Sequence, residues 1–421
     1  MEGREGAQGA PPIPVAAWGT CTGCRLAASE AEELLARIVE NGAVSASGPS
    51  EADLVIVGTC AVTARALSGS RKLVASLRRS TDARIIVTGC AARYSPGSFE
   101  GVDGLVLAPR PGDVLDAAGV ENGEEGFFRC ETRPSCWRSR ALLKVQDGCD
   151  NRCGYCMVPL ARGGSRSLDP AQAVESFDRL ATSGFREVVL TGIDLASWGG
   201  DLPGAPCLAD LVEALADRGA RIRLGSLEPM GLSRGLVARL ARAGVCPHLH
   251  LPLQSASDRV LKAMGRRFTR AGAIELIEWL LESFDSPAIG MDIMTGFPGE
   301  DEAAFEETVG FLEKVPLAYL HVFPFSPRPG TAAWGAAPGA SGRKLSDRVR
   351  ILSGLSVRKR TEYRESLLGK VSEVLVEQRQ RSGRRLGLTE RYVPVAVPEE
   401  CAPGSVVRVE LTRENMAWDI R

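Results

Sequence analysis

Short apolar runs alternate with amphipathic stretches along most of the chain, which predicts strands followed by helices. Between about residues 15 and 120, the clearest strands are predicted at 53–57 and 84–87, with a helix over 30–40 ahead of the first. Strands that alternate with helices favour a parallel sheet, so this part of the chain predicts a small N-terminal α/β domain.

A longer series of the same kind occupies residues 140–342. Six strands are predicted, at 142–145, 187–190, 221–224, 248–251, 288–294 and 318–323. Helices are predicted between them, at 170–182, 208–217, 236–243, 270–283 and 302–314. Six strand–helix units are fewer than the eight of a complete barrel, so we expect an α/β fold whose central domain is a partial (β/α)6 barrel.

The remaining segments lack this alternation. Residues 1–14 are rich in Gly, Ala and Pro and predict a disordered lead-in, while residues 121–139 predict a linker. A basic connecting helix is expected over 343–365. The tail, 366–421, has short alternating runs separated by turn signals, which predicts a small β-barrel.

Composition narrows the class of protein. A chain of 421 residues with 44% hydrophobic residues can form two or three domains with cores of their own. The net charge of −1 excludes a global basic field, so any contact with nucleic acid must be local. No apolar run approaches the ~18 residues of a membrane span, and we expect a cytoplasmic protein with no membrane partner. Twelve cysteines in a reducing compartment favour metal binding or catalysis over disulfides.

Three cysteines, Cys149, Cys153 and Cys156, are spaced Cys-x3-Cys-x2-Cys in one short loop. A closed structural zinc site uses four ligands, and so does an ordinary iron–sulfur cluster. Three thiolates on a four-iron cluster leave one iron open to a small molecule, which favours a catalytic cluster. A zinc knuckle or chance clustering is the alternative.

A second group of cysteines is dispersed along the N-terminal domain. Cys60 and Cys90 each follow a predicted strand, and Cys24 precedes the first helix. Because the carboxyl ends of parallel strands meet at one edge of a sheet, we expect the three to converge and hold a second cluster. Burial as small hydrophobic side chains is the alternative. Cys21 also forms a Cys-x-x-Cys motif with Cys24, which leaves a thioredoxin-like role open.

Several motifs resemble those of the radical S-adenosylmethionine (SAM) methylthiotransferases, from about residue 18 to the C-terminus. They are Gly23-Cys24, Thr59-Cys60-Ala61-Val62-Thr63, Thr88-Gly89-Cys90, the stretch from Gln146 through Cys149 to Ser167, His250 to Ser255, and Gly296 to Glu300. The tail resembles the family's RNA-binding TRAM domain. The resemblance implies a radical SAM barrel, SAM as a cofactor, and two 4Fe-4S clusters, one on each group of three cysteines.

Within the family, Asp147-Gly148-Cys149 and the stretch from Val322 to Thr331 look most like the branch that acts on N6-threonylcarbamoyladenosine at position 37 of tRNA, beside the anticodon. Isopentenyladenosine in tRNA, or an aspartate of a ribosomal protein, is the alternative target. Two positions depart from the family. Ala27 and Gly58 stand where the family often has Asn, which removes two polar neighbours of the second cluster.

The resemblance implies a reaction that replaces the C2–H of the adenine with a methylthio group. An electron from a flavodoxin- or ferredoxin-like donor would lead to cleavage of SAM to a 5′-deoxyadenosyl radical at the first cluster. A second SAM would supply the methyl group, and a sulfur source would feed the second cluster. The two clusters are expected to face one another across the substrate pocket.

For SAM itself, the candidate contacts near strand ends are Tyr155, Gly192, Asp194, Ser226 and Gln254. Each polar one has an alternative role as a strand-end or helix cap. His248 and His250 are expected to be barrel core or structural hydrogen-bonding residues.

The candidate contacts with tRNA phosphates are Arg358, Lys359, Arg360, Arg384, Arg385 and Arg391. A solvated charged face is the alternative. For the whole chain, the alternative from a different class is an iron–sulfur electron carrier or RNA-binding protein without turnover. The predicted barrel argues against a carrier, since a carrier needs no substrate cavity. The sequence does not indicate an oligomeric state.

Overall fold

The computed structural model describes residues 14–121, 127–131, 139–381 and 384–416. Contacts divide the chain into a first unit, Met1–Arg133 with Leu160–Arg162, and a second unit, Pro134–Pro159 with Gly163–Arg421. The predicted lead-in and most of the predicted linker lie outside the described residues. In the part of the chain that is described, no helix is long and apolar enough to cross a membrane.

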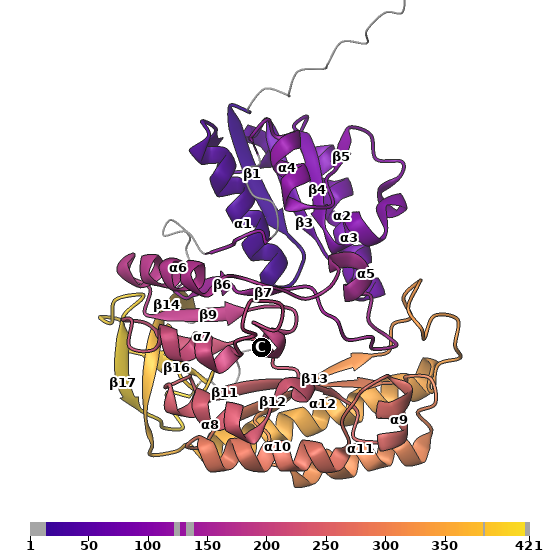
Figure 1. The fold of residues 1–421 in the computed structure, drawn as a ribbon, viewed down its shortest axis with the longest axis vertical. Coiled ribbons are helices and arrows are strands. Elements are labelled where there is room, and N and C mark those ends of the chain that lie inside the picture. Colours follow the sequence, from indigo (N-terminus) through magenta and orange to yellow (C-terminus); the bar gives the residue numbers. More distant parts are fainter. Residues whose placement is uncertain (1–13, 122–126, 132–138, 382–383, 417–421) are drawn as a thin grey trace, which may run out of the picture. The chain divides into compact units, whose positions relative to one another are not determined.

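The first unit is built on a parallel sheet (Figure 1). Its strands are β1 (Ala16–Cys21), β2 (Val44–Ser45), β3 (Leu54–Thr59), β4 (Arg84–Gly89) and β5 (Leu105–Leu107), in the order β2-β1-β3-β4-β5. Every neighbouring pair is parallel. All six residues of β3 are buried, as expected for a central strand covered on both faces. The predicted strands at 53–57 and 84–87 are confirmed, and each continues to the residue before a cysteine.

Helices connect these strands. They are α1 (Arg25–Glu40), α2 (Ala64–Ser80), α3 (Cys90–Tyr94) and α4 (Pro111–Ala117), with 3-10 turns η1 (Pro49–Glu51) and η2 (Pro96–Phe99). Leu34 and Ile38 of α1 pack in one core with Leu54, Ile56 and Ile86 of the sheet. The apolar face of α1 is therefore buried against the strands whose ends carry the dispersed cysteines.

The second unit contains all six strands predicted for the barrel. Strands β6 (Ala141–Lys144), β9 (Glu187–Thr191) and β10 (Arg221–Leu224) form one parallel sheet, and β11 (His248–Gln254), β12 (Ala288–Thr295) and β13 (Tyr319–Pro324) form another. A parallel bridge between Ser226 and His250 joins the two sheets. The two-stranded β7 (Gln146–Asp147) and β8 (Arg166–Ser167) follow β6. The fold is thus mixed α/β, as predicted.

The helices of this unit alternate with its strands along the chain (Figure 1). They are α5 (Val158–Arg162), α6 (Pro170–Thr182), α7 (Leu208–Leu215), α8 (Arg234–Arg242), α9 (Asp258–Ala263), α10 (Arg270–Ser283) and α11 (Glu302–Lys314), with 3-10 turns η3 (Leu195–Ser197) and η4 (Pro229–Gly231). The last residues of α5 belong to the first unit by their contacts. The predicted bounds of α6, α10 and α11 are confirmed to the residue, and α9 was not predicted.

The C-terminal part begins with the long helix α12 (Gly342–Glu365), which packs on β13. Four antiparallel strands follow, β14 (Val371–Arg381), β15 (Arg384–Thr389), β16 (Pro394–Val397) and β17 (Val406–Glu410), in the order β16-β15-β14-β17. Val374, Val395 and Leu411 lie in their common core. The alternating runs of the tail therefore form strands, as predicted.

A buried ion pair fastens this tail to the barrel strands. Arg223 on β10 bonds both carboxylate oxygens of Glu187 on β9, at 2.7 and 2.9 Å, and also donates to the carbonyls of Thr389 and Glu390. Burial opposes ionisation of Glu187, but Arg223 and Arg221 outweigh it and lower its pKa to about 2. Because the folded-state pKa lies below the unfolded one, this contribution to stability is present at neutral pH and is lost as the pH falls toward 2.

Candidate active site

The loop that carries Cys149, Cys153 and Cys156 follows β7, and its shape depends on a glycine. Gly148 has φ +72°, and a Cβ atom there would lie 1.9 Å from the carbonyl oxygen of Gly164. The amide of Cys149 donates to the carbonyl of Gly163 at 3.1 Å. A residue with a side chain could not take this conformation without displacing the backbone at Gly163 and Gly164.

Gln146 connects this loop to the one that follows β9. Its Oε1 accepts from the amides of Ile193 (2.9 Å) and Asp194 (2.7 Å), and its Nε2 donates to the carbonyl of Gly148 (2.9 Å) and the hydroxyl of Ser165 (3.0 Å). The side chain is fully buried. A single amide therefore sets the relative positions of the cysteine loop and of Asp194. Gln146 lies inside a recognised motif, but the sequence pattern gave it no role.

Asp194, a predicted SAM contact, lies beside the first cysteine. Its Oδ2 accepts from Asn151 Nδ2 at 2.8 Å and lies 3.7 Å from Cys149 Sγ. Burial raises the pKa of Asp194, and burial also raises the pKa of Cys149 to about 12. Without a bound cation, the Cys149 thiol is therefore protonated and neutral at physiological pH. A bound metal supplies such charge and favours the thiolate, so this donor set fits an iron–sulfur cluster.

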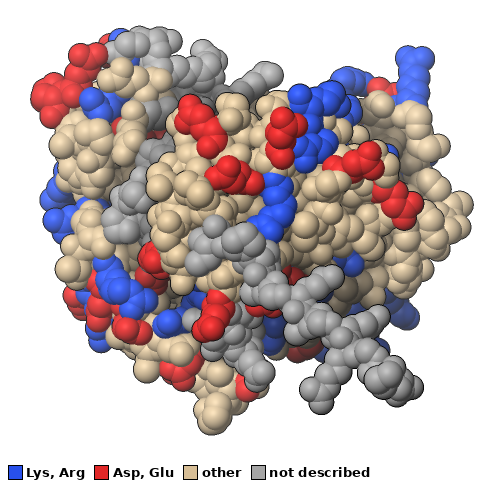
Figure 2. Space-filling model, turned by 90° about the horizontal axis from the view of Figure 1, so that it is seen from above, with Lys and Arg blue, Asp and Glu red and all other residues tan. Residues whose placement is uncertain are grey.

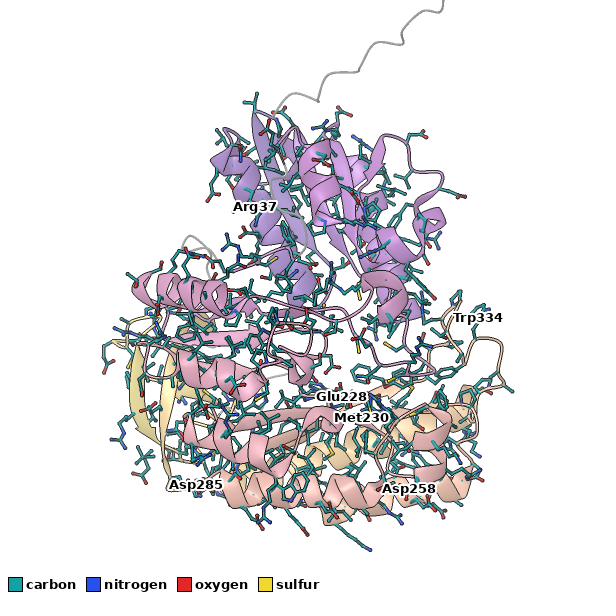
Figure 3. The ribbon with its side chains drawn as sticks, viewed as in Figure 1. Arg37, Glu228, Met230, Asp258, Asp285 and Trp334 are labelled. Atoms are coloured by element: carbon teal, nitrogen blue, oxygen red, sulfur yellow. The ribbon has the colours of Figure 1, made fainter. Side chains whose placement is uncertain are left out.

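An ion pair between the buried Arg266 and the half-buried Glu228 lies beside Cys153. Arg266 bonds both oxygens of Glu228 at 2.7 and 2.6 Å, and its Nη1 lies 3.6 Å from Cys153 Sγ. Glu228 follows β10 and is labelled in Figure 3. An N–H donor at this distance fits a cysteine that carries negative charge as a metal ligand. Sequence reasoning assigned no role to Arg266, because nothing in its local pattern distinguishes it from a surface arginine.

The remaining SAM candidates occupy different surroundings. Tyr155 packs edge-on against Phe297, with ring centroids 6.4 Å apart, and burial raises its pKa well above the usual value. A Cβ at Gly192 would lie 2.8 Å from Gln146 Cβ, so the position needs glycine. Ser226 forms the bridge between the two sheets, and Gln254 ends β11 with φ +73°. Their contacts with SAM stay predictions.

The dispersed cysteines lie at one edge of the first unit's sheet. Cys60 comes directly after β3, Cys90 directly after β4, and Cys24 is the N-cap of α1. Burial, together with the proximity of Cys24 and Cys90, raises the pKa of Cys60 to about 11. The three thiols are therefore close enough to interact electrostatically, which fits a shared metal cluster better than three separate apolar contacts.

Small polar side chains shape the turns that hold these cysteines. Ser70 on α2 accepts from the amide of Cys60 and donates to its carbonyl, both at 3.1 Å, and its hydroxyl lies 2.8 Å from that of Thr22. Gly89 has φ +88°, and a Cβ there would lie 2.7 Å from the carbonyl oxygen of Thr59. The turns after β3 and β4 are thus packed directly on each other.

Cys21 lies against Gly58, one of the two positions that depart from the family pattern. A Cβ at Gly58 would lie 3.0 Å from Cys21 Sγ and 3.3 Å from the carbonyl oxygen of Ala27. The amide of Gly23 donates to Cys21 Sγ at 3.0 Å. Burial raises the pKa of Cys21 to about 11, and Cys24 and Cys60 contribute. Cys21 is therefore a fourth thiol near this edge, and within the described residues no disulfide forms.

Arg162 is a cationic neighbour of the dispersed cysteines and was not predicted. Its guanidinium binds both oxygens of Glu30 on α1 at 2.9 Å, and both side chains are buried. Burial is the largest influence on Cys90 and raises its pKa, while Arg162 opposes this through its charge and a hydrogen bond. A buried cation fits a site that gathers several thiolates. Arg162 lies in a recognised motif, but its partner is 132 residues away.

The basic residues predicted to contact RNA differ in exposure. Lys359 is buried and donates to the carbonyls of Glu313 (2.7 Å) and Val315 (3.0 Å), and Arg391 is buried against Asp285. Both side chains are occupied by protein. Arg358 and Arg384 are exposed. On the face drawn in Figure 2, Lys and Arg are interspersed with Asp and Glu. Trp334, 53% exposed and labelled in Figure 3, was not predicted.

Comparisons with known proteins agree with this geometry. The radical SAM superfamily matches residues 143–312, and the Uncharacterized protein family UPF0004 matches residues 18–105. A threonylcarbamoyladenosine tRNA methylthiotransferase, MtaB of Aquifex aeolicus, is 32% identical over 92% of this chain and 98% of its own. The chain belongs to the radical SAM methylthiotransferase family. The family implies SAM and a 4Fe-4S cluster as cofactors.

Other matches include a relative named for a different nucleoside and a solved structure with low sequence identity. A tRNA-2-methylthio-N(6)-dimethylallyladenosine synthase of Thermus thermophilus is 31% identical over 90% of this methylthiotransferase and 85% of its own chain. The solved structure of the radical SAM methyltransferase TsrM from Kitasatospora setae has a TM-score of 0.55 at 14% identity, covering 76% of this chain and 77% of its own. That likeness supports the fold alone.

Proposed function

We propose that this methylthiotransferase acts on tRNA and converts N6-threonylcarbamoyladenosine at position 37 to its 2-methylthio derivative. The observation that carries the proposal is the full-length match to the Aquifex aeolicus enzyme of that name, together with similar matches to enzymes of the same name in Thermotoga maritima and Bacillus subtilis. Isopentenyladenosine in tRNA is the second candidate, because enzymes named for the dimethylallyl nucleoside match at 30–31% identity.

In this proposal, Cys149, Cys153 and Cys156 hold a 4Fe-4S cluster that, with SAM bound, supplies one-electron reductive chemistry. Gln146 keeps the loop after β9 against the cysteine loop, so that Asp194 lies next to Cys149. Tyr155, Gly192, Ser226 and Gln254 are the further candidates for the SAM site. Arg266 places positive charge beside Cys153 and is itself held by Glu228.

A second 4Fe-4S cluster is proposed on Cys24, Cys60 and Cys90. The support is that two of these residues end neighbouring parallel strands, the third caps α1, and the buried Arg162 lies among them. Sulfur delivered to this cluster would become the methylthio group. The proposal requires an electron donor of the flavodoxin or ferredoxin type and a sulfur source.

The tRNA surface in this proposal uses exposed cations. Arg358 and Arg384 are exposed, and Arg360 and Arg385 are half-buried, so each can reach a phosphate. Lys359 and Arg391 are excluded from this surface by their burial and their bonds to the protein. The C-terminal strands, which resemble a TRAM domain, would carry part of the contact.

The test is anaerobic reconstitution with iron and sulfide, followed by SAM, a reductant and one of two tRNAs. One tRNA carries N6-threonylcarbamoyladenosine and the other carries isopentenyladenosine. The expected products are 5′-deoxyadenosine and the 2-methylthio form of the first nucleoside, measured by mass spectrometry. Methylthiolation of the isopentenyl nucleoside alone would move the target to the second candidate, and the absence of both products would reject the proposed function.

A further inference from the structure

Three polar side chains meet on neighbouring strands of the barrel, away from either group of cysteines in the sequence. His250 on β11, Asp292 on β12 and His321 on β13 have ligand atoms within 4.8 Å of one another. His250 Nε2 lies 2.9 Å from Asp292 Oδ1, and His321 Nδ1 lies 3.3 Å from the same oxygen. Asp292 and His321 are register partners across β12 and β13, so their side chains point to the same face of the sheet.

The charge on Asp292 determines the hydrogen bonds of both rings. Burial opposes its ionisation, but the hydrogen bonds from His250 and His321 outweigh burial and lower its pKa to about 2. At neutral pH the carboxylate therefore only accepts, and each ring donates an N–H to it. His321 uses Nδ1 for this bond. Nε2 is then the atom through which His321 can meet a ligand.

The chain of hydrogen bonds continues inward from His250. Its Nδ1 lies 3.1 Å from the hydroxyl of Tyr319, which lies 2.8 Å from His248 Nε2. The His248 ring stacks on Tyr392 of the C-terminal part, with centroids 4.5 Å apart. These contacts fix the His250 ring from the inner side, and His250 in turn holds Asp292. The orientation of the His321 imidazole is therefore set before any ligand binds.

The outer end of the series is open to solvent. The side chain of His321 is 54% exposed, against 21% for Asp292 and 11% for His250. Residues that alternate with them, such as Leu251 and Met291, are at most 2% exposed and belong to the opposite, covered face. Within the described residues, the structure shows no hydrogen-bond partner for His321 Nε2. The open face thus presents one positioned polar atom.

An exposed aromatic ring lies next to this atom. Phe323 follows His321 by two residues on β13, is 40% exposed, and has its ring centroid 6.4 Å from that of His321. Both side chains are on the same face, with Phe323 closer to the carboxyl end of the strand, where barrel sites take their substrates. A flat base can stack on Phe323 while a group attached to it reaches the imidazole.

We propose that His321, positioned by Asp292 and His250, recognises a polar acyl substituent on N6 of the target adenine, and so selects a threonylcarbamoyl group over a hydrocarbon. This inference rests on the proposed function. A carbamoyl-linked amino acid offers N–H and hydroxyl donors to a neutral imidazole and a carboxylate to a protonated one. A dimethylallyl group offers neither, and it would leave the polar atom desolvated without a partner.

The experiment measures dissociation constants of the reconstituted protein, without reductant, for three anticodon stem-loops. They carry N6-threonylcarbamoyladenosine, isopentenyladenosine or unmodified adenosine at position 37. In wild type, we expect the first to bind best. His321→Leu is expected to reduce the preference of the first over unmodified RNA by about tenfold. His321→Gln retains a polar atom and should restore part of it.

Two matched variants separate recognition from folding. Asp292→Asn keeps the shape and should lower the same preference by a smaller factor. Phe323→Leu should weaken all three RNAs equally and leave the preference unchanged. If His321→Leu weakens all three RNAs by the same factor, or leaves the preference unchanged, the inference is rejected. A non-iron metal bound at one per chain and lost in His321→Leu would reject it as well, since the imidazole would then be a ligand.

The proposed function has its own readout, the methylthio nucleoside made by the wild-type enzyme. If the wild-type enzyme methylthiolates the threonylcarbamoyl nucleoside but His321→Leu keeps the binding preference, the inference is rejected and the proposed function stands. Wild type that binds and modifies the isopentenyl RNA better rejects the proposed target and the inference with it.

Discussion

The two groups of cysteines differ in how the chain brings them together. Cys149, Cys153 and Cys156 lie within eight residues, and their loop is shaped by local glycines and by hydrogen bonds from Gln146. Cys24, Cys60 and Cys90 are far apart in sequence, and their approach depends on the order of β1, β3 and β4 in a parallel sheet. The first group is therefore close together because of its local sequence, whereas the second group is brought together only by the tertiary fold.

The electrostatic surroundings of the two groups of cysteines, in contrast, share one arrangement. Beside the local site, Arg266 is paired with Glu228, and Asp194 adds negative charge next to Cys149. Beside the dispersed site, Arg162 is paired with Glu30. Each site therefore has one buried guanidinium near its thiols, held by a carboxylate. A cluster with cysteine ligands carries net negative charge, so a guanidinium at each site would offset part of the cost of burying one there.

The largest expected effect comes from removing one ligand at each site in turn. Cys153→Ala should abolish SAM cleavage and reduce bound iron from about eight to about four per chain, because three-thiolate sites lose their cluster with one ligand. Cys60→Ala should cause the same loss of iron and end methylthiolation, but it should retain SAM cleavage. Iron analysis and assay of 5′-deoxyadenosine check both.

Cys401→Ser is the control for this pair, because Cys401 is half-buried and packs against the apolar core of the C-terminal part. It should keep both iron and activity. If Cys60→Ala keeps the full iron content, the dispersed cysteines hold no cluster and the comparison between the two sites collapses.

Glycines provide the next test, since each site has one that cannot accept a side chain. In Gly148→Ala, the new Cβ would lie 1.9 Å from Gly164 O, and in Gly89→Ala it would lie 2.7 Å from Thr59 O. Both contacts involve backbone, so we expect each variant to lose iron at its own site, more completely for Gly148. Spectra of the remaining cluster distinguish the two.

Gly244→Ala is the matched control, because Gly244 has φ +73° and open space around its Cβ position. It should cost only about 1 kcal/mol of unfolding free energy, from backbone strain alone. Equal iron loss in all three variants would show that general destabilisation, rather than local geometry, controls the clusters.

The buried pair of Arg162 and Glu30 distinguishes the dispersed site further. Arg162→Leu leaves the Glu30 carboxylate buried without its bidentate partner, which we expect to cost about 3–5 kcal/mol of unfolding free energy. Chemical denaturation of the apo-protein measures this. The double variant with Glu30→Leu should recover most of the loss, and no recovery would mean that Arg162 acts through contacts other than the pair.

Where apolar periodicity and a cap occur together, some helices were predictable from the sequence to the residue. Helices α6, α10 and α11 start after Asp169, Thr269 and Asp301, whose side chains accept from the first turn, and their bounds were predicted to the residue. Helix α2 was missed because it buries only Ser70, Val74 and Leu77. Strand β1 was missed because only one of its residues is buried.

For the candidate site, spacing and strand ends were enough to propose the cysteines, but not the residues that organise them. Gln146 and Arg162 act through partners that are distant in sequence, at Asp194 and Glu30. Composition does not reveal burial either: Lys359 lies next to Arg358 in the basic helix and Arg391 lies in the tail, but both bind protein carbonyls. Such roles depend on tertiary contacts that a single sequence does not encode locally.

Substitution of Cys21 has the smallest expected effect, and it tests how many cysteines bind a cluster at the dispersed site. It lies close to Cys24 and Cys60, yet its Sγ accepts from the amide of Gly23 and fills the space above Gly58. We therefore expect Cys21→Ala to keep about eight irons per chain and to lose under about twofold in methylthiolation, because it removes packing rather than a ligand. If its iron content falls to that of Cys60→Ala, the dispersed site has four thiolates and no open iron. Sulfur could then not be delivered there without first displacing a ligand, and the two cysteine sites would differ in chemistry as well as in construction.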